Sequence, residues 1–225
     1  MVENYHDVPF YPDSVPPLTI AAMTLLVVEI RRCHPRLPIG VNVLRNDATA
    51  ALAIASVTGA GFVRVNVHVG AAVTDQGLVM GQAHQTLRLR HDLGAEIAIL
   101  ADVRVKHARP LAERPLTEEA QDLRRRGLAD AVILTGPVTG AVADPGELAR
   151  LREALPDCPI LIGSGLSTDN LAAYGEQADG FIVGTSFKQG DPPAGGVSAE
   201  RVAQFVAALR LVSLELGRSD RKESP

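Results

Sequence analysis

Asp102, Lys106 and His107 stand at and just beyond the end of an apolar run, which we expect to be a strand over residues 96–103. A carboxylate, an amine and an imidazole at the carboxyl end of a strand can position a substrate, exchange protons or hold a divalent metal. An ion pair between Asp102 and Lys106, with His107 as a loop residue, would explain the same residues without chemistry. We predict that these three residues are catalytic, and we assign no metal site.

Glycines follow two later apolar runs, at residues 160–162 and 180–183. Glycine lets backbone amides approach an anion closely, and a helix that begins nearby directs its positive end to the same place. The same glycines could instead serve only tight turns. We predict a phosphate site that is formed by Gly163, Ser164, Gly165, Gly184, Thr185 and Lys188.

Polar side chains also mark the ends of the remaining apolar runs. Arg45 is difficult to explain by packing, and its guanidinium suits a carboxylate or a phosphate. Asp47 could cap the helix that follows it, and Asp75 is equally consistent with a cap and with a ligand. We expect substrate contacts from Asn42, Arg45, Asn46, Asn66, Asp75 and Thr135.

These residues require a scaffold in which short strands alternate with helices. The apolar runs are rich in Val and Ile and are nearly continuous, which is typical of parallel strands that are covered on both faces. We expect strands at residues 39–43, 62–67, 96–103, 131–134, 160–162 and 180–183. We expect helices at residues 16–33, 48–58, 77–93, 117–126, 145–155, 168–177 and 198–216.

Several helix ends carry recognisable signals. Thr117, which is followed by two glutamates, and Asp144, which is followed by a proline, are typical of helix starts. Gly59, Gly94 and Gly127 follow helical runs, where a left-handed residue is favoured. The chain therefore reads as a series of strand-helix units with one extra helix before the first.

Alternation at this spacing predicts a parallel α/β fold, but it does not distinguish a closed barrel from an open doubly wound sheet. A chain of 225 residues fits one such domain. We predict a single domain over residues 1–216 and a polar, flexible tail over residues 217–225.

Composition argues against several classes of protein. The net charge is −4 and no basic stripe is present, so we expect no nucleic acid partner. The longest apolar stretch, residues 18–28, is too short for a transmembrane helix, and no secretory signal begins the chain. Cys33 and Cys158 lie far apart and have no metal-ligand spacing. We therefore predict a cytoplasmic protein, and the residues do not identify a cofactor.

Segments of this chain, in this order, resemble the BtpA family, also called the BtpA/SgcQ family. The resemblance extends over residues 1–190 and rests above all on NVLRND at residues 42–47, ADVRVKH at residues 101–107 and ADGFIVGT at residues 178–185. It implies a (β/α)8 TIM barrel that is related to phosphate-binding barrels. It also adds Glu3 and Asn4, in the opening segment MVEN, to the expected substrate contacts.

The resemblance also implies that the barrel is truncated at its N-terminus. Family members carry a first strand, a first helix and most of a second strand before the segment that matches residues 1–4. This chain would lack that first unit, either because translation starts further upstream or because the protein is genuinely shortened. A shortened barrel leaves unpaired sheet edges, so in that case we expect a homo-oligomer or low solubility.

Two functions are compatible with the resemblance. The first is binding or conversion of a small phosphorylated metabolite at the carboxyl face of the barrel, with Asp102 or His107 in proton transfer. The second is a non-enzymatic accessory role in photosystem I biogenesis, at the membrane surface. The composition adds no polybasic stripe or lipidation signal in support of the second. The residues alone do not decide whether the protein is an enzyme.

Overall fold

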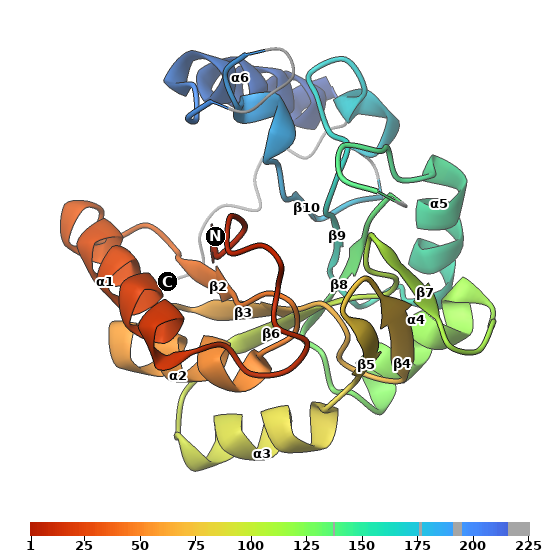
Figure 1. Ribbon diagram of the computed structural model, residues 1–225. Helices are drawn as coiled ribbons and strands as arrows, with labels where there is room; N and C mark the ends of the chain where they lie inside the picture. The colour runs from red at the N-terminus through yellow and green to blue at the C-terminus, as the bar shows by residue number, and fades with distance from the viewer. Residues whose placement is uncertain (137, 176, 191–194, 216–225) are drawn as a thin grey trace. The chain divides into compact units, whose positions relative to one another are not determined.

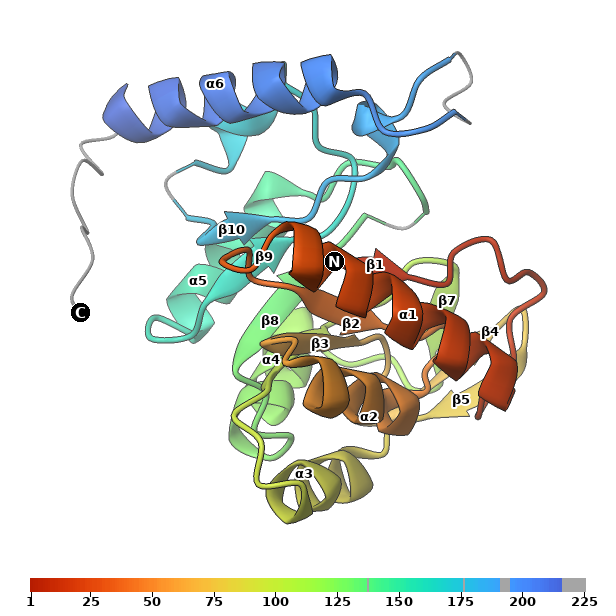
Figure 2. The same ribbon diagram turned by 90° about the vertical axis from the view of Figure 1, so that its left-hand side faces the viewer.

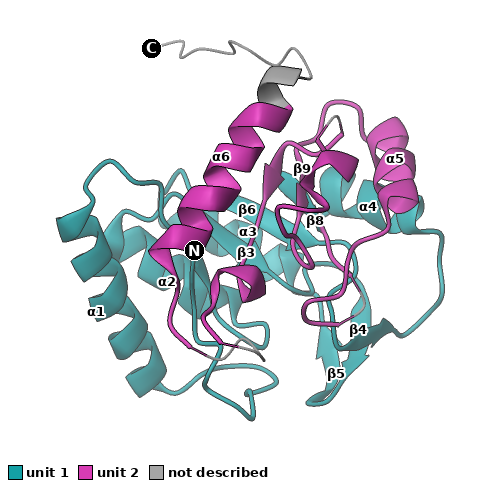
Figure 3. Cartoon of the chain, turned by 90° about the horizontal axis from the view of Figure 1, so that it is seen from above, with its two compact units in different colours: residues 1–133 teal, residues 134–225 magenta. Residues whose placement is uncertain are grey.

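The computed structural model describes residues 1–136, 138–175, 177–190 and 195–215 (Figure 1). Two compact units follow one another along the chain: unit 1 is Met1–Ile133 and unit 2 is Leu134–Pro225 (Figure 3). Strands alternate with helices in both units, as the sequence predicts.

Unit 1 contains a parallel sheet with the strand order β1-β2-β3-β6-β8. Its strands are β1 (Val2–Glu3), β2 (Gly40–Asn42), β3 (Phe62–Val65), β6 (Ala98–Asp102) and β8 (Ala131–Leu134), whose last residue is counted with unit 2. The last four lie within the predicted strands, and β8 has the predicted bounds. The register is parallel throughout, which confirms the parallel α/β architecture.

Helices accompany these strands in unit 1: α1 (Pro17–Cys33), α2 (Ala48–Thr58), α3 (Ala83–Asp92) and α4 (Leu116–Arg125). α2 has the predicted bounds because both of its ends carry a signal. The Asp47 carboxylate accepts a hydrogen bond from the Ala50 amide at 2.9 Å, and Gly59 adopts a left-handed φ of 71°. Asp47 is therefore a helix cap.

Two other predicted helix-end signals are wrong. α4 begins before Thr117, follows Pro115 and has no side-chain cap. After α4 the left-handed residue is Leu128, with φ 50°, rather than Gly127. Gly127 is needed for close approach instead, because a Cβ atom there would lie 2.8 Å from the carbonyl oxygen of Leu123. The prediction for Gly94 is confirmed by its φ of 60°.

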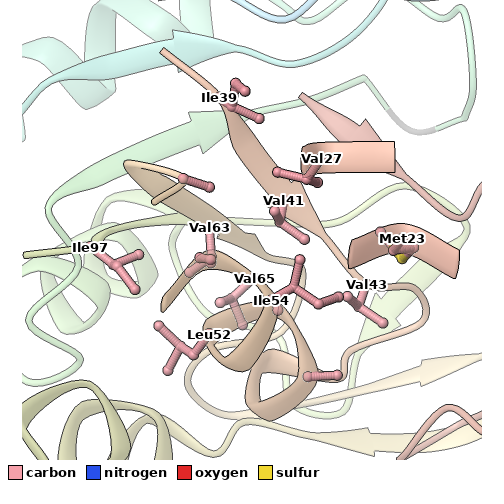
Figure 4. Packing of buried hydrophobic residues seen from close by; sticks show 14 of the residues in the cluster. Met23, Val27, Ile39, Val41, Val43, Leu52, Ile54, Val63, Val65 and Ile97 are labelled. Atoms are coloured by element: carbon pink, nitrogen blue, oxygen red, sulfur yellow. The ribbon is translucent and has the colours of Figure 1, made fainter. Parts of the chain in front are cut away.

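The hydrophobic core of unit 1 lies where α1 and α2 cover the sheet (Figure 4). Val41, Val63 and Ile99 occupy paired positions on β2, β3 and β6, and all three are fully buried. Val27 of α1 and Ile54 of α2 pack into the same cluster. Each such side chain contributes about 1.5–3 kcal/mol relative to an exposed one, so this face of the sheet stabilises the unit.

The start of β2 packs closely against the neighbouring strand. Gly40 is paired with Phe62, the first residue of β3. A Cβ atom at position 40 would lie 1.9 Å from the Phe62 ring. Only glycine therefore fits beneath the ring in this arrangement.

A small antiparallel sheet with the strand order β5-β4-β7 also belongs to unit 1. Its strands are β4 (Ala71–Thr74), β5 (Gly77–Met80) and β7 (Ala108–Pro110). The predicted helix over residues 77–93 is therefore wrong in its first part, because α3 begins only at Ala83. Gly77 has φ 94° and closes a tight turn, after which residues 78–80 alternate between exposed and buried as in a strand. Asp75 lies in this turn and caps no helix.

Unit 2 contains the parallel pair β9 (Ile160–Ile162) and β10 (Gly180–Phe181) and the helices α5 (Pro145–Ala154) and α6 (Ala199–Glu215). β9 has the predicted bounds. Asp144 caps α5 as predicted, through a 2.9 Å hydrogen bond from the Gly146 amide. Figure 2 shows α6 as one continuous helix; residue 216 and the predicted tail, residues 217–225, lie outside the described residues.

The helix predicted over residues 168–177 is wrong for the part of it that is described, which excludes residue 176. Only a short 3-10 helix, η1 (Leu171–Ala173), forms there. The Asn170 side chain accepts a hydrogen bond from the Ser167 amide and donates one to the Gly165 carbonyl. These local bonds compete with the helical hydrogen bonds of the segment.

Candidate functional site

The strands of unit 1 carry polar side chains on the face opposite the hydrophobic core. Successive side chains of a strand point to opposite faces, so the residues that alternate with Val41 and Val63 share the other face. The β1–β2 register pairs Glu3 with Asn42. We call the following side chains the polar face of unit 1: Glu3, Asn42, Arg64, Asn66 and Asp102.

An ion pair between Arg64 and Asp102 lies at the centre of the polar face. The Arg64 Nε and Nη2 atoms donate to the two Asp102 carboxylate oxygens at 3.0 and 2.8 Å. The two residues are 4% and 2% exposed, and Glu3 Oε1 lies 3.5 Å from Arg64 Nη1. Burial opposes the charge on Arg64, but Asp102, with help from Glu3, raises the pKa of the guanidinium above its ordinary value. The Arg64 guanidinium therefore stays charged although it is buried.

Two asparagines extend this network across the strands. Asn66 Nδ2 donates to Asp102 Oδ2 at 2.8 Å. Asn42 Nδ2 donates to Asn66 Oδ1 at 3.0 Å and to the Arg64 carbonyl at 2.9 Å. Asn42 Oδ1 is buried and has no hydrogen-bond partner. The network therefore leaves one buried acceptor unsatisfied.

Arg45 and Lys106 add two cations beside the polar face. Arg45 is 5% exposed; its Nη2 donates to the Lys106 carbonyl at 2.6 Å, and its buried Nε has no partner. Burial lowers the pKa of Arg45. Burial, followed by the charge of Arg64, lowers the pKa of Lys106 as well. Within the described ranges, neither side chain forms an ion pair.

Two predicted contact residues hold loops together. Asn4 accepts a hydrogen bond from the Leu44 amide at 2.7 Å and donates one to the Leu44 carbonyl at 3.1 Å. Asn46 makes the same two bonds with the main chain of Val67, both at 2.8 Å. Each asparagine side chain thereby makes the two main-chain hydrogen bonds that a neighbouring strand would make. Asn4 and Asn46 therefore hold the loops that carry residues of the site.

The remaining predicted residues of unit 1 lie on two loops. His107 directly follows Lys106, is exposed and adopts a left-handed φ of 55°. Asp75 lies in the turn between β4 and β5, and its charge partly offsets the effect of burial on the pKa of Arg45. The structure thus brings most of the predicted residues of unit 1 to the carboxyl ends of β1, β2, β3 and β6.

The predicted phosphate loops belong to unit 2, and the first of them is occupied by internal contacts. Ser164 Oγ accepts from the Gly136 amide at 2.7 Å and donates to the Ala141 carbonyl at 3.1 Å. The Gly163 amide donates to the carbonyl of Leu134 at 2.8 Å. Gly165 has φ 70°, and a Cβ atom there would lie 2.3 Å from the Ala141 carbonyl oxygen. Tight packing therefore accounts for this loop, and its phosphate role stays a prediction.

The second phosphate loop is less constrained. Apart from its two chain neighbours, no heavy atom of the described residues lies within 4 Å of the place where a Cβ atom of Gly184 would stand. Thr185 begins the three-residue 3-10 helix η2 (Thr185–Phe187), and the Lys188 carbonyl accepts a hydrogen bond from Arg201. Thr135, which follows β8, is buried at 7% exposure. The roles of these residues also stay predictions.

Sequence reasoning did not include Arg64 among the site residues. Its signal was nevertheless present, because a charged residue inside the apolar run 62–67 is rarely buried without a partner. Arg64 precedes Asn66 by two positions and so shares a face with it. A buried strand arginine therefore predicts a carboxylate on a neighbouring strand, which here is Asp102.

Comparison with known proteins places this geometry in a family. The model of the BtpA family matches residues 1–210. The chain belongs to the BtpA family. Among its BtpA relatives, the photosystem I biogenesis protein BtpA of Synechocystis sp. is 44% identical over 209 residues, which cover 93% of this chain and 72% of that protein. The resemblance that the sequence motifs indicated is confirmed.

Solved structures show the fold that this BtpA-family chain shares. Phosphoribosyl anthranilate isomerase from Thermus thermophilus has a TM-score of 0.59 at 12% identity, with 84% of this chain and 80% of that chain covered. Thiamine phosphate pyrophosphorylase from Pyrococcus furiosus has a TM-score of 0.52 at 14% identity, with 90% and 80% covered. At these identities the likeness shows the fold alone, which is that of TIM-barrel-like α/β enzymes.

Two further properties bear on the site. In the part of the chain that the structure describes, no helix is long and apolar enough to span a membrane. His, Cys, Asp and Glu side chains of the described residues do not gather in groups of three that could hold a metal ion.

Proposed function

We propose that this protein binds a small phosphorylated metabolite on the polar face of unit 1, with Arg45 and Lys106 in contact with its anionic group. The observation that carries this proposal is a pair of cations, Arg45 at 5% exposure and the partly buried Lys106, that form no ion pair with a carboxylate among the described residues. Burial of an unpaired charge costs several kcal/mol. A phosphate would offset part of that cost through its charge opposite Arg45 and by accepting a hydrogen bond from the Lys106 amine.

The rest of the polar face suits the uncharged part of such a ligand. Asn42 Oδ1 is a buried acceptor without a partner, which a sugar hydroxyl would satisfy. Asp102 accepts hydrogen bonds from Arg64 and Asn66 and so holds these donors in place beside the ligand. Glu3 contributes the second carboxylate at 3.5 Å from Arg64. The site is thereby preorganised for a polar, anionic molecule.

Three residues are the candidates for chemistry at this site: Asp102, Lys106 and His107. The lowered pKa of Lys106 increases the fraction of neutral amine that can accept a proton. His107 stands next to it on an exposed loop, where it can contact a bound ligand. We further propose that unit 2, taken by itself, has a phosphate site formed by Gly163–Gly165, Gly184, Thr185 and Lys188. The phosphorylated molecules in the names of the two solved enzymes support such a ligand by fold likeness only.

A ligand screen tests the proposal directly. Thermal unfolding of the full chain is measured with sugar phosphates, with the matching unphosphorylated sugars and with inorganic phosphate. A true ligand stabilises the folded state by RT ln(1 + [L]/Kd), which is about 2.7 kcal/mol at a hundredfold excess over Kd. Equal shifts with phosphorylated and unphosphorylated sugars, or no shift at all, would contradict the proposal.

Variants of Lys106 then locate the binding site. We expect Lys106→Met to weaken binding about 10- to 100-fold, as for the loss of one charged hydrogen bond, and Lys106→Arg to retain part of the affinity. Arg36→Met is the matched control, because it removes an exposed cation elsewhere on unit 1. Equal losses in Lys106→Met and Arg36→Met would show that only net charge matters.

We propose an accessory role in photosystem I biogenesis as the second candidate function. It is favoured by the 44% identity to the Synechocystis protein of that name. The test is to replace that relative with this chain in Synechocystis and to measure photosystem I content. Restored content supports the accessory role, and restoration by a Lys106→Met chain would separate that role from ligand binding.

A further inference from the structure

The outer face of the small antiparallel sheet is apolar over β4 and β5, where a solvent-facing surface is ordinarily polar, and Arg109 of β7 lies opposite Val73 on that face. Val73 on β4, Leu78 and Met80 on β5, and Leu111 after β7 are 49%, 51%, 61% and 62% exposed. The register places Leu78 beside Val73 on this face. The inner face of the sheet is already buried through Val79 and its neighbours. Apolar side chains on both faces indicate that another molecule contacts the outer one.

The free edge of β5 also presents its main-chain groups outward. The Gly81 amide donates to the Gly70 carbonyl at 2.8 Å, so Gly70 and Gly81 form a hydrogen-bonded pair. Hydrogen-bonded and non-hydrogen-bonded pairs alternate along two antiparallel strands, so this bond determines which residues of β5 bond to β4. Val79 therefore exchanges hydrogen bonds with β4, whereas the N–H and C=O groups of Leu78 and Met80 point away from it. Among the described residues, no hydrogen bond uses these outward groups.

The two edges of this sheet differ in their protection. β7 carries Pro110, which lacks an N–H group, and the charged Arg109, and both features discourage the addition of a strand. β5 and its flank, Gly77 to Gly81, carry neither proline nor charge. Figure 3 shows β5 at the margin of unit 1. β5 is therefore the edge that can accept another strand.

We propose that β5 pairs with β5 of a second copy of this chain, antiparallel and centred on Val79. In this register each Leu78 lies opposite Met80 of the other copy. Two such pairs form four main-chain hydrogen bonds, because the outward groups of the two residues match. Each Gly77 lies opposite Gly81 of the other copy, so no side chains collide at the ends of the strand.

A second copy fits this edge because the segment is self-complementary. The sequence Gly-Leu-Val-Met-Gly has glycines at both ends and large apolar residues on either side of its centre. It carries no charge, so two copies do not repel each other. Closed two-fold pairing uses the same surface on both partners and leaves no free β5 edge. The segment Gly77 to Gly81 shares no residue with the polar face.

The oligomeric state of the full chain tests this proposal. We expect light scattering after size exclusion to give the mass of a dimer, which Met80→Lys converts to a folded monomer. Val57→Lys is the matched control, since Val57 is an apolar residue of α2 with 73% exposure, and it should remain a dimer. A monomeric wild type, or a Met80→Lys variant that stays dimeric, would overturn the proposal; far-UV circular dichroism confirms that each variant is folded.

A cysteine cross-link tests the register itself. At the centre of the paired strands the two copies of residue 79 face each other as a non-hydrogen-bonded pair about 4.5 Å apart, within the reach of a disulfide. We expect Val79→Cys, in a Cys33→Ser background, to form a covalent dimer on oxidation, whereas Val73→Cys, on the central strand, does not. A dimer without this cross-link uses another surface, and that result would also overturn the proposal.

Discussion

The two faces of the unit 1 sheet come from alternate residues of the same strands, yet they are buried by different means. On the helix-facing side, Val41, Val63 and Ile99 are covered by apolar side chains. On the polar face, Arg64 and Asp102 are nearly as buried, but each compensates the charge of the other and supplies its hydrogen-bond partner. Apolar contacts are not directional, so the helix-facing side tolerates substitution by apolar side chains of similar shape. The polar face tolerates only side chains that keep the specific hydrogen-bond and charge partners.

The sharpest test of this difference removes one partner from the polar face. We expect Asp102→Ala to cost about 3–5 kcal/mol of unfolding free energy, because it leaves the buried Arg64 charge uncompensated. Urea denaturation measures the loss. The double variant Arg64→Leu/Asp102→Leu should recover much of it. A loss below about 1 kcal/mol in the single variant would show that water reaches this pair.

The corresponding change on the core face removes volume rather than charge. We expect Ile99→Ala to cost about 3 kcal/mol, within the usual range for large-to-small substitutions, because Ile99 is fully buried. Ile99→Val should cost only about 1 kcal/mol in the same denaturation experiment. If both variants lose the same amount, packing volume does not determine the stability of this face.

A smaller loss of stability is expected when the polar cap of α2, a helix that covers the hydrophobic core, is removed. The Asp47 carboxylate caps α2 and also accepts a 2.9 Å hydrogen bond from the Val15 amide. Asp47→Ala should cost about 1–2 kcal/mol, and Asp47→Asn less, because the amide oxygen can still accept. Thermal unfolding followed by circular dichroism distinguishes the two variants; identical melting curves would argue against the cap.

The smallest expected effect is a pH dependence that is confined to the polar face. Because burial lowers the pKa of Lys106, the protonated amine destabilises the folded state, and this penalty fades as pH rises towards the ordinary lysine value of 10.5. Lys106→Met removes the penalty. We expect this variant to be more stable than wild type at neutral pH, with the difference shrinking towards pH 10.5. A constant difference across this range would contradict the assignment.

The sequence predicts elements well where local chemistry agrees with the tertiary structure. α2 is bounded by Asp47 and Gly59, and both signals act as expected. The hairpin β4–β5 was missed because its apolar residues were assigned to the helix that follows, although Gly77 marks a turn. The segment around Asn170 was also misassigned, because the bonds made by that side chain depend on neighbours that periodicity does not reveal.

The candidate site was predictable in its location but not in its connections. The polar residues at positions 42, 66 and 102 follow apolar runs, and this pattern alone indicates one edge of a parallel sheet. The sequence did not reveal that Asp102 is bound by Arg64, or that Asn4 and Asn46 hold loops. These pairings join residues that are 21 to 40 positions apart, and only the register of the strands brings them together.

Gly40 and Phe62 illustrate a different kind of constraint. Because the ring of Phe62 fills the space that a side chain at position 40 would need, neither position varies independently of the other. Across homologous proteins, the two positions should covary: a larger residue at 40 should be accompanied by a smaller one at 62. A designer who redraws this sheet must therefore treat the two sites as a single choice.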